Sequence, residues 1–414
     1  MIKYNKYVLS NGLRLLHHYN AATQMVALNL RYDVGSRDEN PERTGLAHLF
    51  EHLMFGGSVN APDFDAALQA AGGSSNAWTS SDCTNFYEVL PAHNIETALW
   101  LESDRLMNLN LDDRAVEIQK SVVIEEFKQR CLNRPYGDVS HLMNSLAYKV
   151  HPYRWPVIGV APSHISEASI KEIQDFYYSH YSVDRMVMCI SGNVTFDDAV
   201  QLVEKWFGDI KPRATALRHL PIEPAQTQPR VLKAHRDVPE NMIMRIYHMC
   251  GVNDKDFVAS DLLSDVLANG TSARFHRNVM MKYDLFSDLD AVIVGSNDPG
   301  LLYITARLSE GADAQQAIDV VDAELGKLHA EGVTEREVQR YANKHVSREL
   351  YENISYDAVA EKLCRYEMLG DASRINTEND EYLAATADDI NRVAHDVFRK
   401  DNCSTLYYGP AVEE

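Results

Sequence analysis

A proline-rich segment near the middle of the chain limits how this sequence can fold. No apolar periodicity runs through residues 209–238, and proline recurs there at positions 212, 221, 224 and 229. Proline continues neither a helix nor a central strand, so we predict an inter-domain linker at residues 212–229. The chain has 414 residues, more than one hydrophobic core usually accommodates. The sequence therefore predicts two domains, residues 1–211 and residues 230–414.

The two predicted domains end with the same succession of elements. In the first, an amphipathic helical stretch at 170–178 precedes an apolar strand at 186–190 and then a glycine. In the second, a helical stretch at 390–398 precedes a strand at 404–408 and again a glycine. This repetition indicates a duplicated domain. Strand-like runs interrupted by long helical stretches favour the α+β class, with two homologous α/β sandwich domains that each pack helices on a mainly antiparallel sheet.

The composition of the chain limits which kinds of partner it can bind. The formal net charge is −20, and binding to nucleic acid or to an anionic membrane requires a basic surface, so we expect neither as a partner. No apolar run approaches the roughly 20 residues of a membrane-spanning helix. The N-terminus has no apolar leader, which predicts a cytoplasmic protein, or a periplasmic one if a leader has been removed. The six cysteines are scattered and form no metal-binding pair.

The segment TGLAHLFEHLMFGG, residues 44–57, carries the candidate chemistry. It predicts a helix that Thr44 caps and that the two final glycines end. His48, Glu51 and His52 fall on one face of this helix. Imidazoles at positions i and i+4 can bind one metal ion from successive turns, and the carboxylate between them can reach a metal-bound water.

This H-x-x-E-H order reverses the commoner zinc motif and is typical of inverzincins. Zinc lowers the pKa of its bound water to about 7, and a carboxylate that is not a ligand then removes the proton. Glu51 is the candidate for that general base. A purely structural zinc site would close all four positions, usually with cysteines, and no cysteine lies within this motif. The pattern therefore favours a hydrolytic site.

A catalytic zinc needs a third protein ligand, and the helical stretch Glu117–Lys128 offers two candidates. Glu125 and Glu126 are adjacent there, about 100° apart around a helix, so only one of them can face the metal. Periodicity alone leaves Glu126 only slightly ahead of Glu125.

Taken together, these residues resemble the pitrilysin and insulinase family of zinc peptidases, which includes the mitochondrial processing peptidases. The likeness covers nearly the whole chain. Beyond the H-x-x-E-H motif it rests on three further stretches, GGSSNAWT at 72–79, HPYRWPVIG at 151–159 and MCISGNV at 188–194. Separate matches in the same order argue against chance agreement.

The resemblance implies a role for each candidate residue. His48 and His52 would be zinc ligands and Glu51 the general base, with one zinc ion per chain. In the family pattern the ligand glutamate follows a valine by four residues, which selects Glu126. A supporting glutamate of the family would fall on Gln119, which can still hydrogen-bond but adds no negative charge.

Substrate contacts and partners follow from the same resemblance. Asn76, Ala77 and Thr79 would lie on an edge strand whose backbone pairs with an extended peptide. The family encloses its substrate in a clam-like chamber of four homologous domains, so two domains form half of a chamber and imply a second half-length chain. An arginine and a tyrosine of the family, which hold the substrate carbonyl, align here with Met280 and Ser287. We therefore expect a dimer and favour a heterodimer with a zinc-less homologous subunit that supplies this pair.

The sequence as a whole predicts a zinc-dependent endopeptidase that cleaves peptides within an enclosed chamber. The alternative is a non-catalytic subunit, like the core proteins of respiratory complexes that share this fold. The complete set of His48, Glu51, His52 and Glu126 favours the enzyme, because a scaffold does not require it.

Overall fold

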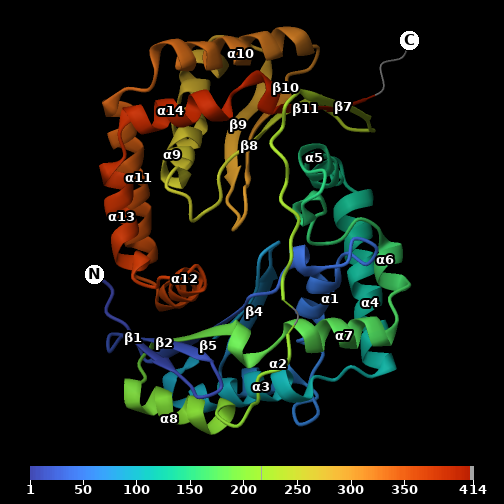
Figure 1. Ribbon diagram of the computed structural model, residues 1–414, viewed down its shortest axis with the longest axis vertical. Helices are drawn as coiled ribbons and strands as arrows, with labels where there is room; N and C mark the ends of the chain where they lie inside the picture. Colours follow the sequence, from blue (N-terminus) through green and yellow to red (C-terminus); the bar gives the residue numbers. More distant parts are fainter. Residues whose placement is uncertain (216, 411–414) are drawn as a thin grey trace. The chain divides into compact units, whose positions relative to one another are not determined.

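The computed structural model describes residues 1–215 and 217–410. Contacts group the chain into two compact units that interleave in sequence. Unit 1 comprises Met1–Arg130, Trp155–Pro221 and Leu350–Thr377, and unit 2 comprises Cys131–Arg154, Ile222–Glu349 and the chain from Glu378 onward. Each unit contains one sheet, as Figure 1 shows.

The sheet of unit 1 has six strands in the order β1-β2-β6-β3-β5-β4. Only β2 and β6 pair in parallel, and all the other neighbours are antiparallel. β4 lies at one edge, with β5 as its one partner. The strands are β1 (Asn5–Val8), β2 (Arg14–Tyr19), β3 (Met25–Tyr32), β4 (Ser74–Thr79), β5 (Thr84–Pro91) and β6 (Met186–Gly192).

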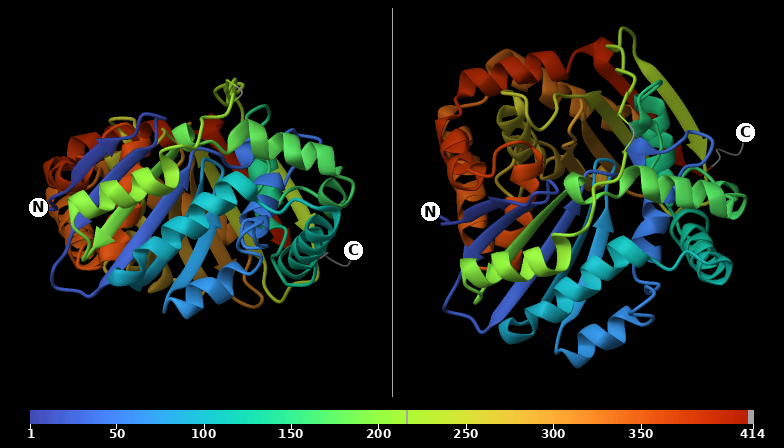
Figure 2. Two further views of the ribbon diagram at one scale, coloured as in Figure 1. Left: turned by 90° about the horizontal axis from the view of Figure 1, so that it is seen from below. Right: turned by 60° about the horizontal axis from the view of Figure 1, so that its bottom comes forward.

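Successive side chains of a strand point to opposite faces, and in this sheet both faces are buried by helices. Leu15 and Leu28 belong to a large core with residues of α1, α3, α7 and α8, and α3 and α8 lie side by side along that face (Figure 2). Leu16 and Ala27 belong to a second cluster that α12 covers. The helices of unit 1 are α1 (Leu46–Leu53), α2 (Phe64–Ala70), α3 (Ile95–Asn108), α4 (Asp113–Phe127), α6 (Pro162–Ser166), α7 (Ile170–His180), α8 (Phe196–Phe207) and α12 (Tyr356–Met368).

The sheet of unit 2 repeats this strand order. Its five strands run β7-β11-β8-β10-β9, and again a single parallel pair, β7 with β11, precedes three antiparallel ones. Strands β2, β6, β3, β5 and β4 of unit 1 therefore correspond in order to these five. The strands are β7 (Arg230–His235), β8 (Met242–His248), β9 (Phe286–Val294), β10 (Leu301–Leu308) and β11 (Cys403–Gly409).

Helices also cover both faces of this second sheet. Ile243 and Ile304 face Ala317 and Val321 of α10, while α9 packs on β9 and against α14. On the other face, α5 buries Leu146 against sheet residues such as Met244. The helices are α5 (Val139–Ala147), α9 (Phe257–Ala268), α10 (Ala314–Glu331) and α14 (Ala387–Val397), and α11 (Glu335–Glu352) and α13 (Arg374–Ala384) flank α12 in the chain.

The two sheets thus exchange helices reciprocally. α12 comes from the C-terminal half of the sequence but belongs to unit 1, and α5 comes from the N-terminal half but belongs to unit 2. The repeated strand order confirms the predicted α+β class with two related domains. The segment between α8 and β7 contains no helix or strand among its described residues, as expected of a linker, although boundaries at 211 and 230 stay a prediction.

Two arginines of the linker bind residues elsewhere in unit 1. Arg218 pairs with Asp33 (2.9 Å) and Asp38 (2.6 Å), and Arg213 donates to the carbonyl oxygens of Tyr181 and Leu106.

Among the residues described, no helix combines the length and apolarity needed to cross a membrane.

Candidate metal centre

Helix α1 begins at Leu46, and a glycine precedes it. Gly45 is the N-cap residue with φ 93°, a left-handed conformation that glycine adopts without a steric cost. The prediction that Thr44 caps the helix is wrong, because its hydroxyl instead accepts a hydrogen bond from the Val160 amide (2.9 Å). The helix also ends at Leu53, before the glycines that were expected to end it.

A buried carboxyl group takes the place of the expected cap. Glu39 accepts hydrogen bonds from the amides of Gly45 (2.9 Å) and Ala47 (2.8 Å), the free donors at the start of α1. Burial raises the pKa of Glu39 to about 8, and the two amides oppose that rise. Glu39 therefore fixes the start of the helix that carries the candidate histidines.

His48 and His52 project from the same face of α1, one turn apart, with their rings edge to face at a centroid distance of 4.9 Å. His48 is 7% exposed. Burial lowers its pKa to about 4, although Glu126 opposes the shift. The His48 imidazole is therefore neutral near pH 7, the form that binds metals. Its buried Nδ1 has no hydrogen-bond partner within the described part of the chain.

Helix α4 supplies the acidic residue. Its first turn is capped by Asp112, which accepts a hydrogen bond from the Ala115 amide (2.7 Å). The buried ammonium of Lys120 ties the middle of the helix to the carbonyl oxygen of Ala168 (3.0 Å). The cap marks the start of α4, and the bond from Lys120 joins the helix to the segment before α7.

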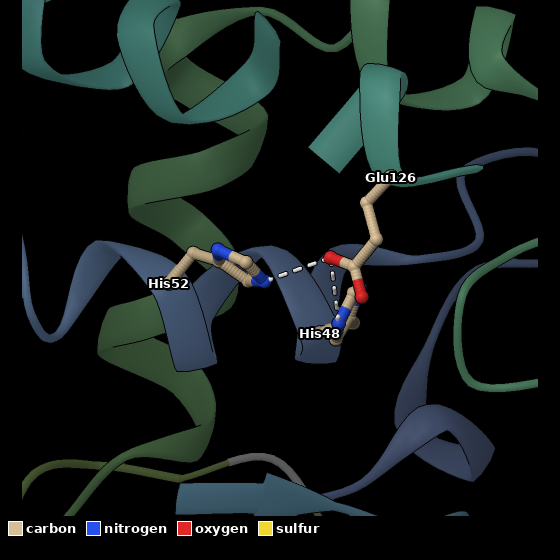
Figure 3. Close-up of side chains that lie close together, drawn as sticks. All are labelled: His48, His52 and Glu126. Atoms are coloured by element: carbon tan, nitrogen blue, oxygen red, sulfur yellow. Dashed lines mark ion pairs between the residues drawn. The ribbon is translucent and has the colours of Figure 1, made fainter. Parts of the chain in front are cut away.

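The side chains of the two adjacent glutamates of α4 point in different directions, as helical geometry requires. Glu126 points toward both histidines, as Figure 3 shows, whereas Glu125 is exposed and pairs with Lys128 (2.6 Å). The hydrogen bond from His52 lowers the pKa of Glu126, so this carboxyl is ionised at neutral pH. The structure brings Glu126, and not Glu125, to the pair of histidines.

The three side chains converge on one point. Oε2 of Glu126 lies 3.2 Å from Nε2 of His52 and 3.6 Å from Nε2 of His48, and one ligand atom from each residue lies within 4.8 Å of the others. A zinc ion that binds its ligands at about 2.0–2.2 Å in tetrahedral geometry separates them by about 3.3–3.6 Å. The donor set therefore fits zinc, and in the described chain this group offers three protein ligands and leaves a fourth position open.

Glu51 lies on α1 between the histidines but is not part of this group. Its Oε2 accepts a hydrogen bond from the Thr79 hydroxyl at 2.5 Å. Burial raises the pKa of Glu51, and the bond from Thr79 opposes the rise. A carboxylate that is half-buried and held by one donor retains its second oxygen for another proton donor.

The other residues of the candidate site lie around α1. Asn76, Ala77 and Thr79 all belong to β4, which is an edge strand as predicted, and β4 contacts α1. The side-chain nitrogen Nε2 of Gln119 lies 3.8 Å from the position that a Cβ atom would occupy at Gly56. Gln119 therefore faces the residues that directly follow α1. Its supporting role stays a prediction.

The positions aligned with the family's arginine and tyrosine lie in unit 2. Ser287 is on β9 and donates a hydrogen bond to Glu240 (3.0 Å). Met280 is half-buried in the short helical turn Phe275–Met280. Neither a thioether nor a hydroxyl already engaged with a carboxylate offers the donor that a guanidinium would.

Three contacts of this site were not predicted. Glu39 caps α1 from outside its local sequence, so no spacing rule points to it. Arg130, in the π-helical turn that follows α4, pairs with Oε1 of Glu126 at 2.9 Å, and its i+4 spacing was a usable signal. The hydrogen bond from Thr79 to Glu51 joins β4 to α1, two segments that are far apart in the sequence.

Comparison with known proteins agrees with this architecture. Residues 14–159 match the profile described as "Insulinase (Peptidase family M16)", and residues 167–344 match "Peptidase M16 inactive domain". The chain belongs to peptidase family M16, the insulinase family. The second profile covers most of unit 2, whose sequence has no H-x-x-E-H motif.

Relatives include both zinc proteases and a processing-peptidase subunit. The chain is 26% identical to the zinc protease PqqE of Helicobacter pylori over 99% of its own length and 93% of that protein. It is 30% identical to the beta subunit of the mitochondrial-processing peptidase of Saccharomyces cerevisiae, over 49% of this chain and 44% of that subunit.

Solved structures share the fold. The crystal structure of a protease from Helicobacter pylori has a TM-score of 0.92 at 26% identity, with 99% of this chain and 100% of that chain covered. The periplasmic protease PqqL from Escherichia coli has a TM-score of 0.80 at 17% identity, and the match covers 98% of this chain but 47% of that one.

Proposed function

We propose that this chain is a zinc-dependent endopeptidase. The observation that carries the proposal is the convergence of two imidazoles on one oxygen of Glu126, at 3.2 and 3.6 Å, with all three ligand atoms within 4.8 Å of one another and a further carboxylate beside them that is not part of the group. Three protein ligands with an open fourth position are typical of catalytic zinc. His48, His52 and Glu126 would hold one zinc ion per chain.

Each residue then has a distinct task. Bound zinc would supply a Lewis acid that polarises the scissile carbonyl and makes water more acidic. Glu51 would accept the proton of the attacking water and deliver it to the leaving amine. Thr79 would hold Oε2 of Glu51, so that the other oxygen is the one that exchanges the proton. Gln119 would support the metal residues as a neutral hydrogen-bonding group.

The open edge of β4 would bind the substrate. An extended peptide can add to an exposed strand edge through main-chain hydrogen bonds, which demand little of the peptide's sequence. Asn76, Ala77 and Thr79 would present that edge, and Thr79 also contacts Glu51. Binding and chemistry would thus meet at the end of one strand.

A second half-length chain would complete the enclosed chamber. This chain matches 47% of the length of PqqL, and its relative in yeast mitochondria is named as a subunit. Met280 and Ser287 stand where the family has its arginine and tyrosine. A zinc-less homologous partner that supplies this pair is therefore the favoured arrangement.

The competing function is a non-catalytic subunit. Its support is the second profile, which describes an inactive domain, together with Met280 and Ser287. That profile covers residues 167–344 and so none of the candidate zinc ligands. The complete constellation in unit 1 is the reason for preferring an enzyme.

Hydrolysis of quenched fluorescent peptides by the purified chain tests the proposal, with zinc content measured in parallel. Glu51→Gln removes the base but no ligand, and Glu125→Gln is the matched control because Glu125 faces solvent. We expect cleavage by the wild type and Glu125→Gln, and zinc retained without cleavage in Glu51→Gln. Zinc binding without cleavage by the wild type, alone or with a homologous partner chain, would favour the non-catalytic subunit.

A further inference from the structure

The two oxygens of Glu126 have different partners. Oε2 faces Nε2 of His52 and of His48, at 3.2 and 3.6 Å. Oε1 instead meets Nη2 of Arg130 at 2.9 Å, within hydrogen-bonding reach. Arg130 lies one turn further along, in the π-helical turn Lys128–Leu132 that directly follows α4. The carboxylate is therefore held between the candidate metal position and a guanidinium.

A neighbouring pair on the same turn provides a comparison. Lys128 binds Glu125 at 2.6 Å, and these side chains are 44% and 63% exposed. In the other pair Arg130 is 65% exposed but Glu126 only 18%. Ion pairs between exposed side chains contribute little to stability, so the pair of Lys128 with Glu125 is a suitable control. The pair at Arg130 differs because its carboxylate faces the histidines.

A donor on one carboxylate oxygen has two opposite effects on a metal. It restricts rotation of the carboxylate and leaves only one oxygen free, which favours binding through a single oxygen in a fixed geometry. It also places a positive charge near the cation, which opposes binding. Because the guanidinium is largely exposed to solvent, its charge is screened, and the orienting effect should dominate.

We propose that Arg130 is a positioning residue for the metal: it holds Oε1 of Glu126 so that Oε2 alone is presented together with the two imidazoles. The inference rests on the proposed zinc site. Arg130 does not contact the ligating nitrogens and takes no part in proton transfer. Its contribution is to set the geometry of the third ligand before the ion arrives.

Zinc affinity tests this role without an activity assay. The dissociation constant of the full chain would be measured at pH 7 by competition with a chelating dye, for the wild type, Arg130→Met, Arg130→Lys and Lys128→Met. We expect Arg130→Met to weaken zinc binding by about 10- to 100-fold, as is usual when the partner of a ligand is lost. Arg130→Lys should recover most of the affinity, and Lys128→Met should match the wild type.

Cobalt substitution gives an independent readout of geometry. The visible absorption of bound Co²⁺ depends on the number and arrangement of its ligands, so freeing the second oxygen should change the spectrum in Arg130→Met alone. Equal or tighter zinc binding in Arg130→Met, or a cobalt spectrum identical to that of the wild type, would overturn the inference and leave the zinc site intact. Failure of the wild type to bind zinc would instead overturn the proposed function, and this inference with it.

Discussion

Replacement of Leu363 by alanine tests whether unit 1 depends on a helix from the far end of the sequence. Leu363 lies on α12, is fully buried, and packs in the cluster that covers Leu16 and Ala27 of the first sheet. All four tryptophans of the protein, at positions 78, 100, 155 and 206, belong to unit 1. Their fluorescence therefore reports on unit 1 and not on unit 2.

The expected magnitude follows from burial. Replacing a fully buried leucine by alanine costs about 2–5 kcal/mol, through lost apolar contact and the cavity left behind. That is a large part of the roughly 5–15 kcal/mol that stabilises a typical domain. With a urea dependence near 3 kcal/mol per molar, the transition midpoint should fall by about 1 M.

Urea titrations followed by tryptophan fluorescence measure the effect. Leu350→Ala is the matched control, because Leu350 lies in the same segment of unit 1 but is 61% exposed. It should change stability by no more than about 0.5 kcal/mol. If Leu363→Ala left the tryptophan transition within that range, α12 would not be part of the folded core of unit 1, and the reciprocal exchange of helices would be refuted.

Three further predictions concern the site and the pH dependence of stability. Thr79→Val removes the donor to Glu51 and should lower the hydrolysis rate about 10- to 100-fold with zinc content unchanged, whereas unchanged hydrolysis would exclude the positioning role. Chelation of zinc should abolish hydrolysis and lower the melting temperature, with both restored by added zinc; persistent activity would argue against a metal enzyme. In unit 2, burial raises the pKa of Glu337, but hydrogen bonds from Arg274 and Thr334 outweigh it and hold the pKa at about 2, against an ordinary 4.5. Because the folded-state pKa is depressed, this pair stabilises the protein above pH 4.5 and loses that effect as pH falls toward 2. Arg274→Met should therefore cost about 1–2 kcal/mol at pH 7, after allowance for solvent screening, and progressively less below pH 4.5 in denaturation experiments; a cost independent of pH would contradict this.

Local sequence patterns were sufficient to predict much of the secondary structure and half of the candidate site. Alternating and periodic apolar residues predicted the strands and helices that end each domain, because those patterns depend only on neighbours in sequence. The spacing of His48, Glu51 and His52 predicted their common face for the same reason. Periodicity could not choose between Glu125 and Glu126, because that choice depends on how α4 is rotated against α1.

What escaped prediction depends on distant contacts. No pattern in residues 356–368 shows that α12 covers the first sheet, since an amphipathic helix reveals its apolar face but not its partner. Thr44 was assigned as a cap from residue type, yet Gly45 takes that position and Glu39 bonds the free amides. Tertiary contacts decided both outcomes.

The most direct test of the zinc site is anomalous X-ray diffraction at the zinc edge from crystals of this chain grown with zinc. We expect one strong peak per chain, at about 2.0–2.2 Å from Nε2 of His48, Nε2 of His52 and one oxygen of Glu126. A strong peak at other residues, or none despite added zinc, would contradict the proposed zinc site.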